Sequence, residues 1–401
     1  MSIRLFSSAI RTHLRLHKIS VFAPVRYSRG FAPYGKPGSG NYGRTLGKQT
    51  VGLIEPLRDR ILNRVTSIPF NAKDSVFSIG DYGAADGSAS MPFIGQLVAN
   101  LKDQHGPEAQ FQVIYEDTEV NDFNSLFKRV LGIIPDPQVY LPDMDNVYVL
   151  ASGTDFYKQC VPSNSMHFIM CMISLLWLSE TPVKYNNSLY KYPESSAEEK
   201  IALDRRAEID LETFLLWRSR EMKQGGLLFI CALCEIKDVN TEQVHAGTLI
   251  TLLTEIWKEY RDSGEISTDE FLNTNFSFCF HNMDQLRKPF DDKSSAVSKS
   301  GLCLLSAETV IIPDIVYTAW KDKKDKEGID DREEFARRYI ATHRTWCNNT
   351  FMNGLSDSRS QEEKEKIVDG FFDRVEKGMS KINPEEIKDD LQFIYLVITK
   401  K

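Results

Sequence analysis

Apolar runs separated by amphipathic stretches predict that β-strands alternate with helices in the first part of the chain. Residues 76–79 open one strand and residues 111–116 form a second. Between them, apolar residues at helical spacing predict a helix that begins near Pro92, with Ser90 as its N-cap. The order strand, Gly-rich turn, helix and strand is the opening unit of a nucleotide-binding α/β sheet.

The same patterns predict the remaining elements. Helices are expected at 50–66, 121–131, 166–178, 196–222, 244–262, 331–347 and 361–379, and strands at 146–150, 227–233 and 391–399. The most apolar stretch, 167–178, is too short to span a bilayer and predicts a buried helix. Because strands lie at both ends of the pattern, we expect one α/β sheet that is completed late, with a helical insertion.

The turn after the first strand and the end of the second strand suggest a ligand site. The turn holds Gly83 and Gly87 but is neither a GxGxxG fingerprint nor a P-loop, because no GK[ST] follows. The second strand ends in Glu116 and Asp117, where this architecture binds ribose hydroxyls. A nucleoside site and an ordinary βαβ unit with surface acids both remain open.

Three loops meet at the carboxyl edge of the expected sheet, and each contains an acid. They contribute Asp81 and Gly83, Asp117 and Thr118, and Asp155 and Phe156. Such loops could bind an amino group, a ribose and an adenine. Neither GxSxG nor HExxH occurs, and the seven histidines are scattered. This favours a transferase whose donor is already activated and whose protein supplies alignment.

Charge and cysteine usage argue against a nucleic-acid-binding protein and against a zinc site. Nine Lys and Arg residues precede the first acid, Glu55, so the rest of the chain has 40 basic and 56 acidic residues, a net charge of −16. An acidic body argues against nucleic acid as a partner. The seven cysteines form no paired framework; the CxxC of Cys231 and Cys234 lies in an apolar run and lacks a second ligand pair for zinc.

The N-terminal residues have the composition of a mitochondrial presequence. Arg4, Arg11 and Arg15 share one face of an acid-free helix, and apolar residues share another. The alternative is a disordered basic arm with accidental periodicity. Residues 1–41 are therefore expected to be a mitochondrial presequence and a Gly- and Pro-rich lead-in; without import, the protein would be cytoplasmic.

Five stretches of the chain resemble motifs of the SABATH family, the plant salicylate, jasmonate and caffeine-pathway methyltransferases. The family's YxxNSxxQ keeps its Tyr and Gln as Tyr42 and Gln49, and DLGCSSGPN keeps its Asp and both glycines from Asp81. NDLPGNDFN matches 116–124, PGSFY matches 153–157, and LHFIHSSYSLMWLSQVP matches 166–182, the most specific of the five. The Asn-Ser pair of the first motif is lost.

The resemblance implies S-adenosylmethionine-dependent carboxyl methylation and assigns roles by position. The cofactor would contact Tyr42, Asp81, Gly83, Gly87, Asp117, Thr118, Asp155 and Phe156. The substrate would contact Gln49, Ile173, Leu176 and Trp177, and the departures at Ile173 and Leu176 leave its identity open. Some relatives bind Mg²⁺, which cannot be assigned to residues here. A homodimer is compatible with the sequence.

The expected fold is α/β, a Rossmann-like methyltransferase sheet with helices on both faces and a helical cap. Residues 42–240 would bind S-adenosylmethionine, 241–345 would form the mainly helical cap, and 346–401 would supply a helix and the closing strand. The methyl group would pass to the carboxylate of a small organic acid without a general base. Two alternatives are N- or O-methylation of a heterocycle or hydroxyl, with His167 as base, and a non-catalytic binding role in mitochondria.

Overall fold

The computed structural model describes residues 34–401 apart from 74, 137–143, 192–194, 235–246 and 388–389, so the expected presequence lies outside the described residues. The strands are β1 (Val76–Tyr82), β2 (Gln110–Asp117), β3 (Val147–Gly153), β4 (Met166–Met172), β5 (Met222–Leu233), β6 (Leu302–Ile312) and β7 (Leu391–Lys400). The helices before β5 are α2 (Asn41–Val51), α3 (Arg58–Thr66), α4 (Met91–His105), α5 (Phe123–Val130) and α6 (Ala197–Glu221). The later helices are α7 (Gly247–Asp262), α8 (Thr268–Asn273), α9 (Met283–Asp291), α10 (Ala296–Lys299), α11 (Ile315–Glu327), α12 (Arg332–Gly354) and α13 (Gln361–Met379). The described residues also include three 3₁₀ turns: η1 (Gly52–Leu57), η3 (Ser174–Leu176) and η4 (Pro384–Glu386).

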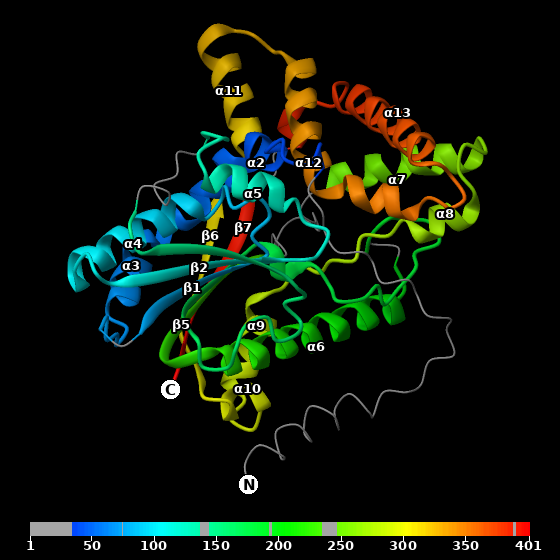
Figure 1. Ribbon diagram of the computed structural model, residues 1–401. Coiled ribbons are helices and arrows are strands. Elements are labelled where there is room, and N and C mark those ends of the chain that lie inside the picture. Colours follow the sequence, from blue (N-terminus) through cyan, green and yellow to red (C-terminus); the bar gives the residue numbers. More distant parts are fainter. Residues whose placement is uncertain (1–33, 74, 137–143, 192–194, 235–246, 388–389) are drawn as a thin grey trace.

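The strands form one sheet in the order β3-β2-β1-β4-β5-β7-β6 (Figure 1). β1 to β5 are parallel to one another, whereas β7 pairs antiparallel with both β5 and β6. The chain leaves β1 toward β2 on one side and later returns to β4 on the other. The carboxyl ends of β1 and β4 therefore flank the point where the strand order reverses, which is where open α/β sheets bind ligands.

Side chains alternate between two apolar cores, one on each face of the sheet. In β4, Phe168 and Met170 face the core shared with α3 and α4, while Ile169 and Cys171 face the core shared with α6 and α9. All seven residues of β4 are buried. The expected α/β fold with helices on both faces is confirmed.

The helix expected over 166–178 is wrong, because this stretch is β4 followed by η3. A parallel strand covered on both faces has no polar side, so its apolar run is continuous and lacks the alternation that marks a half-exposed strand. Continuous runs of this length do not distinguish a buried strand from a buried helix.

Two other boundaries differ from expectation. The helix expected over 50–66 is divided into α2, η1 and α3, with Pro56 inside the 3₁₀ turn. The strand expected over 227–233 begins earlier, at Met222, so Gly225 and Gly226 lie within β5. There Gly225 has φ +78° and the pairing with β4 changes register. Glycine tolerates this backbone conformation, so the strand can kink without ending.

Helices α7, α8, α12 and α13 gather beside the carboxyl edge of the sheet and pack on one another (Figure 1). Their apolar faces meet around Trp257, which is fully buried and contacts Phe351 and Phe371 edge-on. Within residues 241–345, α7 and α8 belong to this helical group, whereas β6 is the edge strand of the sheet. The expected domain boundaries after residues 41, 240 and 345 stay predictions. Among the described helices, none is long and apolar enough to cross a membrane.

Candidate functional site

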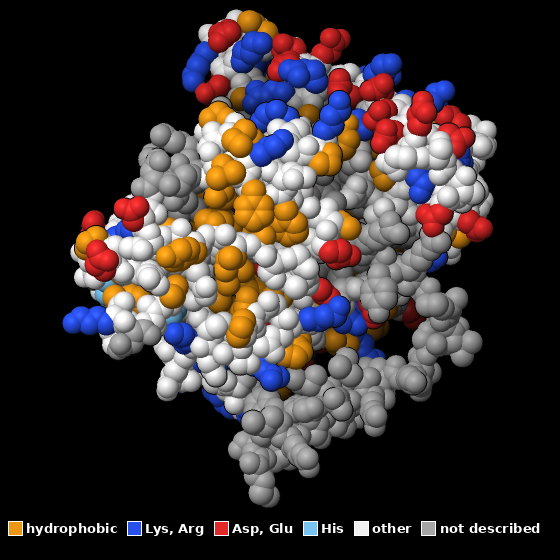
Figure 2. Space-filling model, in the orientation of Figure 1, with side chains coloured by type: hydrophobic (Ala, Val, Ile, Leu, Met, Phe, Trp, Pro, Cys, Tyr) orange, Lys and Arg blue, Asp and Glu red, His pale blue; other side chains and the backbone are white. Residues whose placement is uncertain are grey.

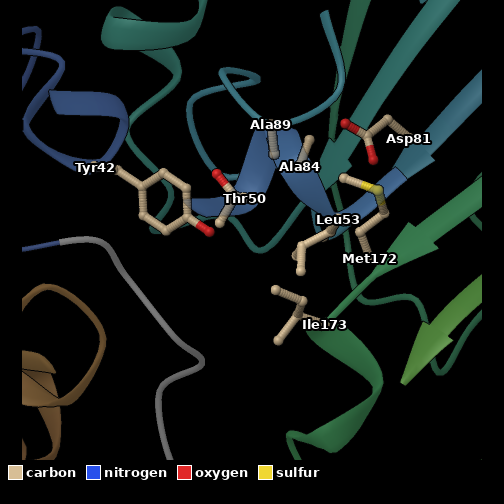
Figure 3. Close-up of a pocket in the computed structure, with 9 residues that line it drawn as sticks. Tyr42, Thr50, Leu53, Asp81, Ala84, Ala89, Met172 and Ile173 are labelled. Atoms are coloured by element: carbon tan, nitrogen blue, oxygen red, sulfur yellow. The ribbon is translucent and has the colours of Figure 1, made fainter. Parts of the chain in front are cut away.

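A pocket opens at the carboxyl ends of β1 and β4 and is closed on one side by α2 (Figure 3). Its empty volume is about 280 Å³, including the part open to solvent. The lining residues come from α2, η1, the loop after β1 and the end of β4: Tyr42, Thr50, Leu53, Asp81, Gly83, Ala84, Ala89, Met172 and Ile173. Five of these residues have apolar side chains, and the polar side chains supply two hydroxyls and one carboxyl.

The loop from Gly83 to Ser90, which we call the glycine loop, packs closely against other side chains at its two glycines. Gly83 has φ +76°, and a Cβ there would lie 2.0 Å from Ser174 Oγ. Gly87 has φ +74°, and its Cβ would lie 2.4 Å from Met91 Cε. Only glycine fits both the conformation and the space. Gly83 therefore lets the loop pass close to Ser174 at the edge of the pocket.

The Asp81 carboxyl, at the end of β1, is almost completely buried in the pocket wall. Ser90 Oγ donates a hydrogen bond to its Oδ2. Ser90 is the N-cap of α4, as expected, but its hydroxyl donates to Asp81 and makes no cap hydrogen bond with the helix. Burial, and secondarily the charge of Asp117, raise the pKa of Asp81 to about 7, while the Ser90 hydrogen bond opposes this shift.

Asp117 connects the end of β2 to the glycine loop. Its Oδ2 accepts the Ala85 N–H at 2.8 Å, and its Oδ1 accepts the Thr118 N–H at 2.7 Å. Burial raises the pKa of Asp117 to about 6, although these two backbone donors lower it. An ionised carboxylate has about four acceptor positions, so Asp117 retains capacity for a ligand.

Tyr42 extends from α2 into the pocket, with its ring on the side where Thr50 lies (Figure 3). Burial, and then the charges of Asp86, Asp117 and Asp81, raise the pKa of the Tyr42 hydroxyl. The hydroxyl is therefore protonated at neutral pH and can donate a hydrogen bond. Gln49, also on α2, is half-buried and does not line the pocket.

The loop after β3 contains Asp155 and Phe156, and Arg218 of α6 binds its backbone. Arg218 donates from Nη1 to the Phe156 carbonyl and from Nη2 to the Lys158 carbonyl, both at 2.9 Å. Arg218 and Glu221 form a fully buried ion pair at 2.8 Å, and Glu221 also accepts the backbone N–H of Cys160 at 2.6 Å. This charged network fixes the loop, while the Asp155 side chain remains 43% exposed.

Glu116 lies beside this network rather than in the pocket. Its Oε1 accepts the Thr154 hydroxyl at 3.1 Å, and its side chain is fully buried. Burial, and then the charge of Asp117, raise the pKa of Glu116 to about 8, although Arg218 lowers it. Of the two acids at the end of β2, Asp117 faces the glycine loop and Glu116 faces α6.

Ile173 lines the pocket in a backbone conformation that is rare for a branched residue, with φ +66°. Its N–H donates to the Cys231 carbonyl at 2.8 Å, and the chain then turns into η3. Such conformations persist where the surrounding structure imposes them, and they concentrate at ligand sites. Strand β4 thus ends in a strained residue aimed at the pocket (Figure 3).

Trp177 follows η3 and joins an aromatic group, the Trp177 cluster, which is centred on Phe278. Around Phe278 lie Trp177 at 5.7 Å, Tyr190 at 4.4 Å, Phe276 at 5.4 Å, Phe280 at 5.1 Å and Trp346 at 6.0 Å, measured between ring centroids. Tyr157 Oη donates to the Trp177 carbonyl at 2.6 Å, which links this cluster to the loop after β3. Leu176 is buried and does not line the pocket.

The structure brings Tyr42, Asp81, Gly83 and Ile173 together around one pocket and places Asp117 directly behind the glycine loop. Gly87, Thr118, Asp155, Phe156, Gln49, Leu176 and Trp177 lie outside its lining. Sequence reasoning missed Thr50, Leu53, Ala84, Ala89 and Met172. The first two share a helical face with Tyr42, at eight and eleven residues, and this spacing could have indicated them.

His167 lies far from the pocket, so the suggestion that it acts as a base is wrong. It is the second residue of β4, and Ile173 follows the opposite end, about 20 Å away at the rise of an extended strand. His167 Nδ1 accepts the Ser78 N–H at 3.0 Å, and the ring stacks on Phe77 at 4.4 Å. Burial, and then Lys223, lower the pKa of His167 to about 4. This histidine is a satisfied core residue.

Metal binding finds no support in the described part of the chain, where no three His, Cys, Asp or Glu residues form a ligand group. None of the seven cysteines, all of which are described, forms a disulfide bond, and Cys231 and Cys234 are buried, as expected for core residues.

A family profile described as SAM dependent carboxyl methyltransferase matches residues 47–401. Farnesoic acid carboxyl-O-methyltransferase of Arabidopsis thaliana is 24% identical over 281 residues, which cover 66% of this chain and 76% of the relative. Gibberellic acid methyltransferase 1 of the same plant is 25% identical over 277 residues, which cover 65% and 68%. Loganic acid methyltransferase, solved with S-adenosylhomocysteine (SAH), has the same fold, with a TM-score of 0.68 at 20% identity over 92% of this chain and 98% of that one. The match over most of the chain, on this fold, places the protein in the family of S-adenosylmethionine-dependent carboxyl methyltransferases, the SABATH family.

Proposed function

We propose that this protein transfers the methyl group of S-adenosylmethionine to a carboxylate oxygen of a small, largely apolar organic acid, through the pocket beside Asp81. The observation that carries this proposal is the pocket's lining. It combines a buried carboxyl and two hydroxyls with apolar groups, and none of its described lining residues is His, Lys or Arg. The family membership supplies the reaction class.

The residues present fit S-adenosylmethionine. The cofactor is cationic at its sulfonium and ammonium groups. Burial raises the pKa values of Asp81, in the pocket wall, and of Asp117, behind the glycine loop, so a nearby cation would stabilise their ionised forms. Asp81 would bind the ammonium group and Asp117 the ribose hydroxyls. Gly83 lets the glycine loop pack against Ser174, which fills the position that a Cβ would take, and so fixes the wall beside Asp81. Asp155 and Phe156, on the loop held by Arg218, would contact the adenine.

The chemistry needs alignment rather than proton transfer. When bound, S-adenosylmethionine supplies a methyl group on a positively charged sulfur; as the carboxylate oxygen bonds to the methyl carbon, the carbon–sulfur bond breaks, leaving a methyl ester and SAH. Carboxylic acids have pKa values near 4 to 5, so the acceptor is already ionised at pH 7. The apolar wall formed by Leu53, Met172 and Ile173 would exclude water and orient the acceptor.

The Trp177 cluster supports an acceptor with an apolar body. Trp177 is half-buried and adjoins the pocket through η3 and Ile173, so one side of the cluster could pack on the acceptor. The relatives are named for farnesoic and gibberellic acids, which agrees with a small organic acid as the acceptor class.

The test uses the full-length protein. SAH binding is measured by calorimetry, and a panel of carboxylic acids, phenols and amines is then incubated with methyl-labelled S-adenosylmethionine. We expect SAH to bind and label to enter the carboxylic acids alone, in a base-labile ester. Labelling of phenols or amines would support the alternative acceptor class, and an absence of SAH binding would support a non-catalytic role. Light scattering of the same preparation tests whether the protein forms a homodimer.

A further inference from the structure

A buried ion pair behind the pocket joins the glycine loop to α5. Arg129 of α5 and Asp86 of the loop have side chains 0% and 2% exposed, and Nη2 lies 2.7 Å from Oδ2. Arg129 Nε also donates to the Asp86 carbonyl at 3.2 Å. Neither residue lines the pocket. One guanidinium therefore binds both the side chain and the backbone at the tip of the loop, and this holds the loop against α5.

The same carboxylate also binds α2, which closes the pocket. Asp86 Oδ2 accepts the Gly43 N–H at 3.0 Å, while Oδ1 accepts the N–H of Ser88 at 3.1 Å. A Cβ on Gly43 would lie 2.4 Å from Arg129 Nη2, so the first turn of α2 rests directly on the ion pair. Tyr42, the neighbour of Gly43, projects into the pocket (Figure 3).

The residues that lead into α2 are attached to the same helix. Gly38 N–H is shared between the two carboxylate oxygens of Asp122, at 2.9 and 3.0 Å, and Gly40 N–H donates to Ser125 Oγ at 2.8 Å. Helix α5 thus carries the lead-in on its N-terminal residues and the ion pair one turn later. In Figure 1, α2 and α5 lie beside each other above the edge of the sheet.

We propose that Asp86 and Arg129 are positioning residues for the cofactor: the ion pair sets the distance between α2, with Tyr42, and the glycine loop. The proposal rests on the proposed function, because it takes the pocket between these two elements as the S-adenosylmethionine site. A buried ion pair is weak evidence for net stability, whereas it constrains geometry through its many directed hydrogen bonds. Losing it would leave α2 attached but displaced from the loop.

The experiment measures SAH binding by calorimetry, well below the melting temperatures, for the wild type, Arg129→Met, Tyr42→Phe and the double variant. Arg129→Met keeps an unbranched apolar side chain and removes the guanidinium with its charge. We expect its Kd for SAH to rise about tenfold or more. If Arg129 acts through Tyr42, Tyr42→Phe should weaken binding much less in the Arg129→Met background than in the wild type, because residues that act as a unit are not additive. A merely structural role would leave the two effects additive.

Arg359→Met is the matched control, because Arg359 forms an ion pair with the buried Glu270 at 2.6 Å in the helical group. We expect it to lower the melting temperature while its SAH affinity stays within about twofold of wild type. If Arg129→Met does not fold, Asp86→Asn, which keeps the side-chain volume and one acceptor oxygen, replaces it in the same cycle.

Two results would overturn the proposal: wild-type SAH affinity in the folded variant of the ion pair, or additive effects with Tyr42→Phe. Wild-type protein that does not bind SAH at all would instead contradict the proposed function. The two failures are therefore distinguishable in a single set of titrations.

Discussion

Asp117 Oδ2 accepts the Ala85 N–H at 2.8 Å, so the acid that ends β2 holds the loop that follows β1. Two parts of the candidate cofactor site thus depend on one side chain. A change at Asp117 removes a ligand group and also releases the glycine loop, and experiments at this position have to separate the two effects.

Asp117→Ala should weaken SAH binding by about 2–4 kcal/mol, because charge-assisted hydrogen bonds to the ribose are lost. Calorimetry measures this change. Asp117→Asn serves as the comparison for the loop, since its amide oxygen can still accept the Ala85 N–H while the negative charge is lost. An Asp117→Ala variant with unchanged affinity would contradict the assignment of this acid to the cofactor.

The raised pKa of Asp81 should make the stability of the ligand-free protein fall with rising pH. Below about pH 4, Asp81 is protonated in both the folded and the unfolded state. Between about pH 4 and its folded pKa of about 7, the folded state retains a proton that the unfolded state has lost, so the free energy of unfolding decreases through this window. Above it, the contribution is constant.

Urea unfolding at pH 5, 6, 7 and 8 tests this for the wild type and Asp81→Asn. The variant cannot titrate at this position, so its free energy of unfolding should fall less steeply over the same range. Groups that do not interact with Asp81 contribute equally to both proteins and cancel in the difference. The charge of Asp117 acts on Asp81, so the difference includes the coupling of these two carboxyls. Parallel pH profiles would show that Asp81 is ionised in the folded protein.

Arg218→Met should destabilise the protein by about 3–5 kcal/mol, because it leaves Glu221 buried without its partner. It should also raise the Kd for SAH, since the Phe156 and Lys158 carbonyls lose their donor. Arg220, two residues along α6 and exposed, provides the control Arg220→Met. Equal SAH affinity in both folded variants would show that the loop after β3 does not contribute to cofactor binding.

His167→Asn should leave the pH dependence of methyl transfer unchanged. The Asn Oδ1 atom can replace Nδ1 as acceptor for the Ser78 N–H, while the titrating ring is lost. With an acid identified by the panel and saturating S-adenosylmethionine, the single-turnover rate should be level from about pH 6 to 9 in both proteins. A rise with pH that disappears in the variant would restore His167 as a base and favour a hydroxyl or amine acceptor.

The mitochondrial presequence stays a proposal, and residues 1–40 fused to a fluorescent protein test it. The fusion should enter mitochondria, and replacing Arg4, Arg11 and Arg15 by Glu should prevent entry, because import follows the positive face of the helix. Replacing three exposed lysines of the fluorescent protein by Glu controls for the change in charge. Cytosolic fluorescence from the unchanged fusion would contradict the presequence.

The sequence predicts the elements around Asp81 and Asp117 because local signals define them: apolar alternation, a turn of small residues and an acid at a strand end. It does not predict β4 as a strand, because burial on both faces removes the alternation. Nor does it predict that Arg129 meets Asp86, a contact between residues 43 positions apart that only the packing of α5 on the loop creates. Long-range contacts of this kind leave no periodic signal.

The place of β7 in the sheet sets the order in which the protein can fold. β7 follows β5 and β6 in the chain and lies between them in space, so these two strands cannot join one sheet until β7 has been synthesised. Tyr395 of β7 also donates to the Leu53 carbonyl, so the wall of the pocket closes on a strand more than three hundred residues away. Pairings across such separations form slowly, because a long loop must close before they contribute. A chain emerging from the ribosome would therefore lack its completed sheet until β7 itself has emerged, however early β1 to β5 are made.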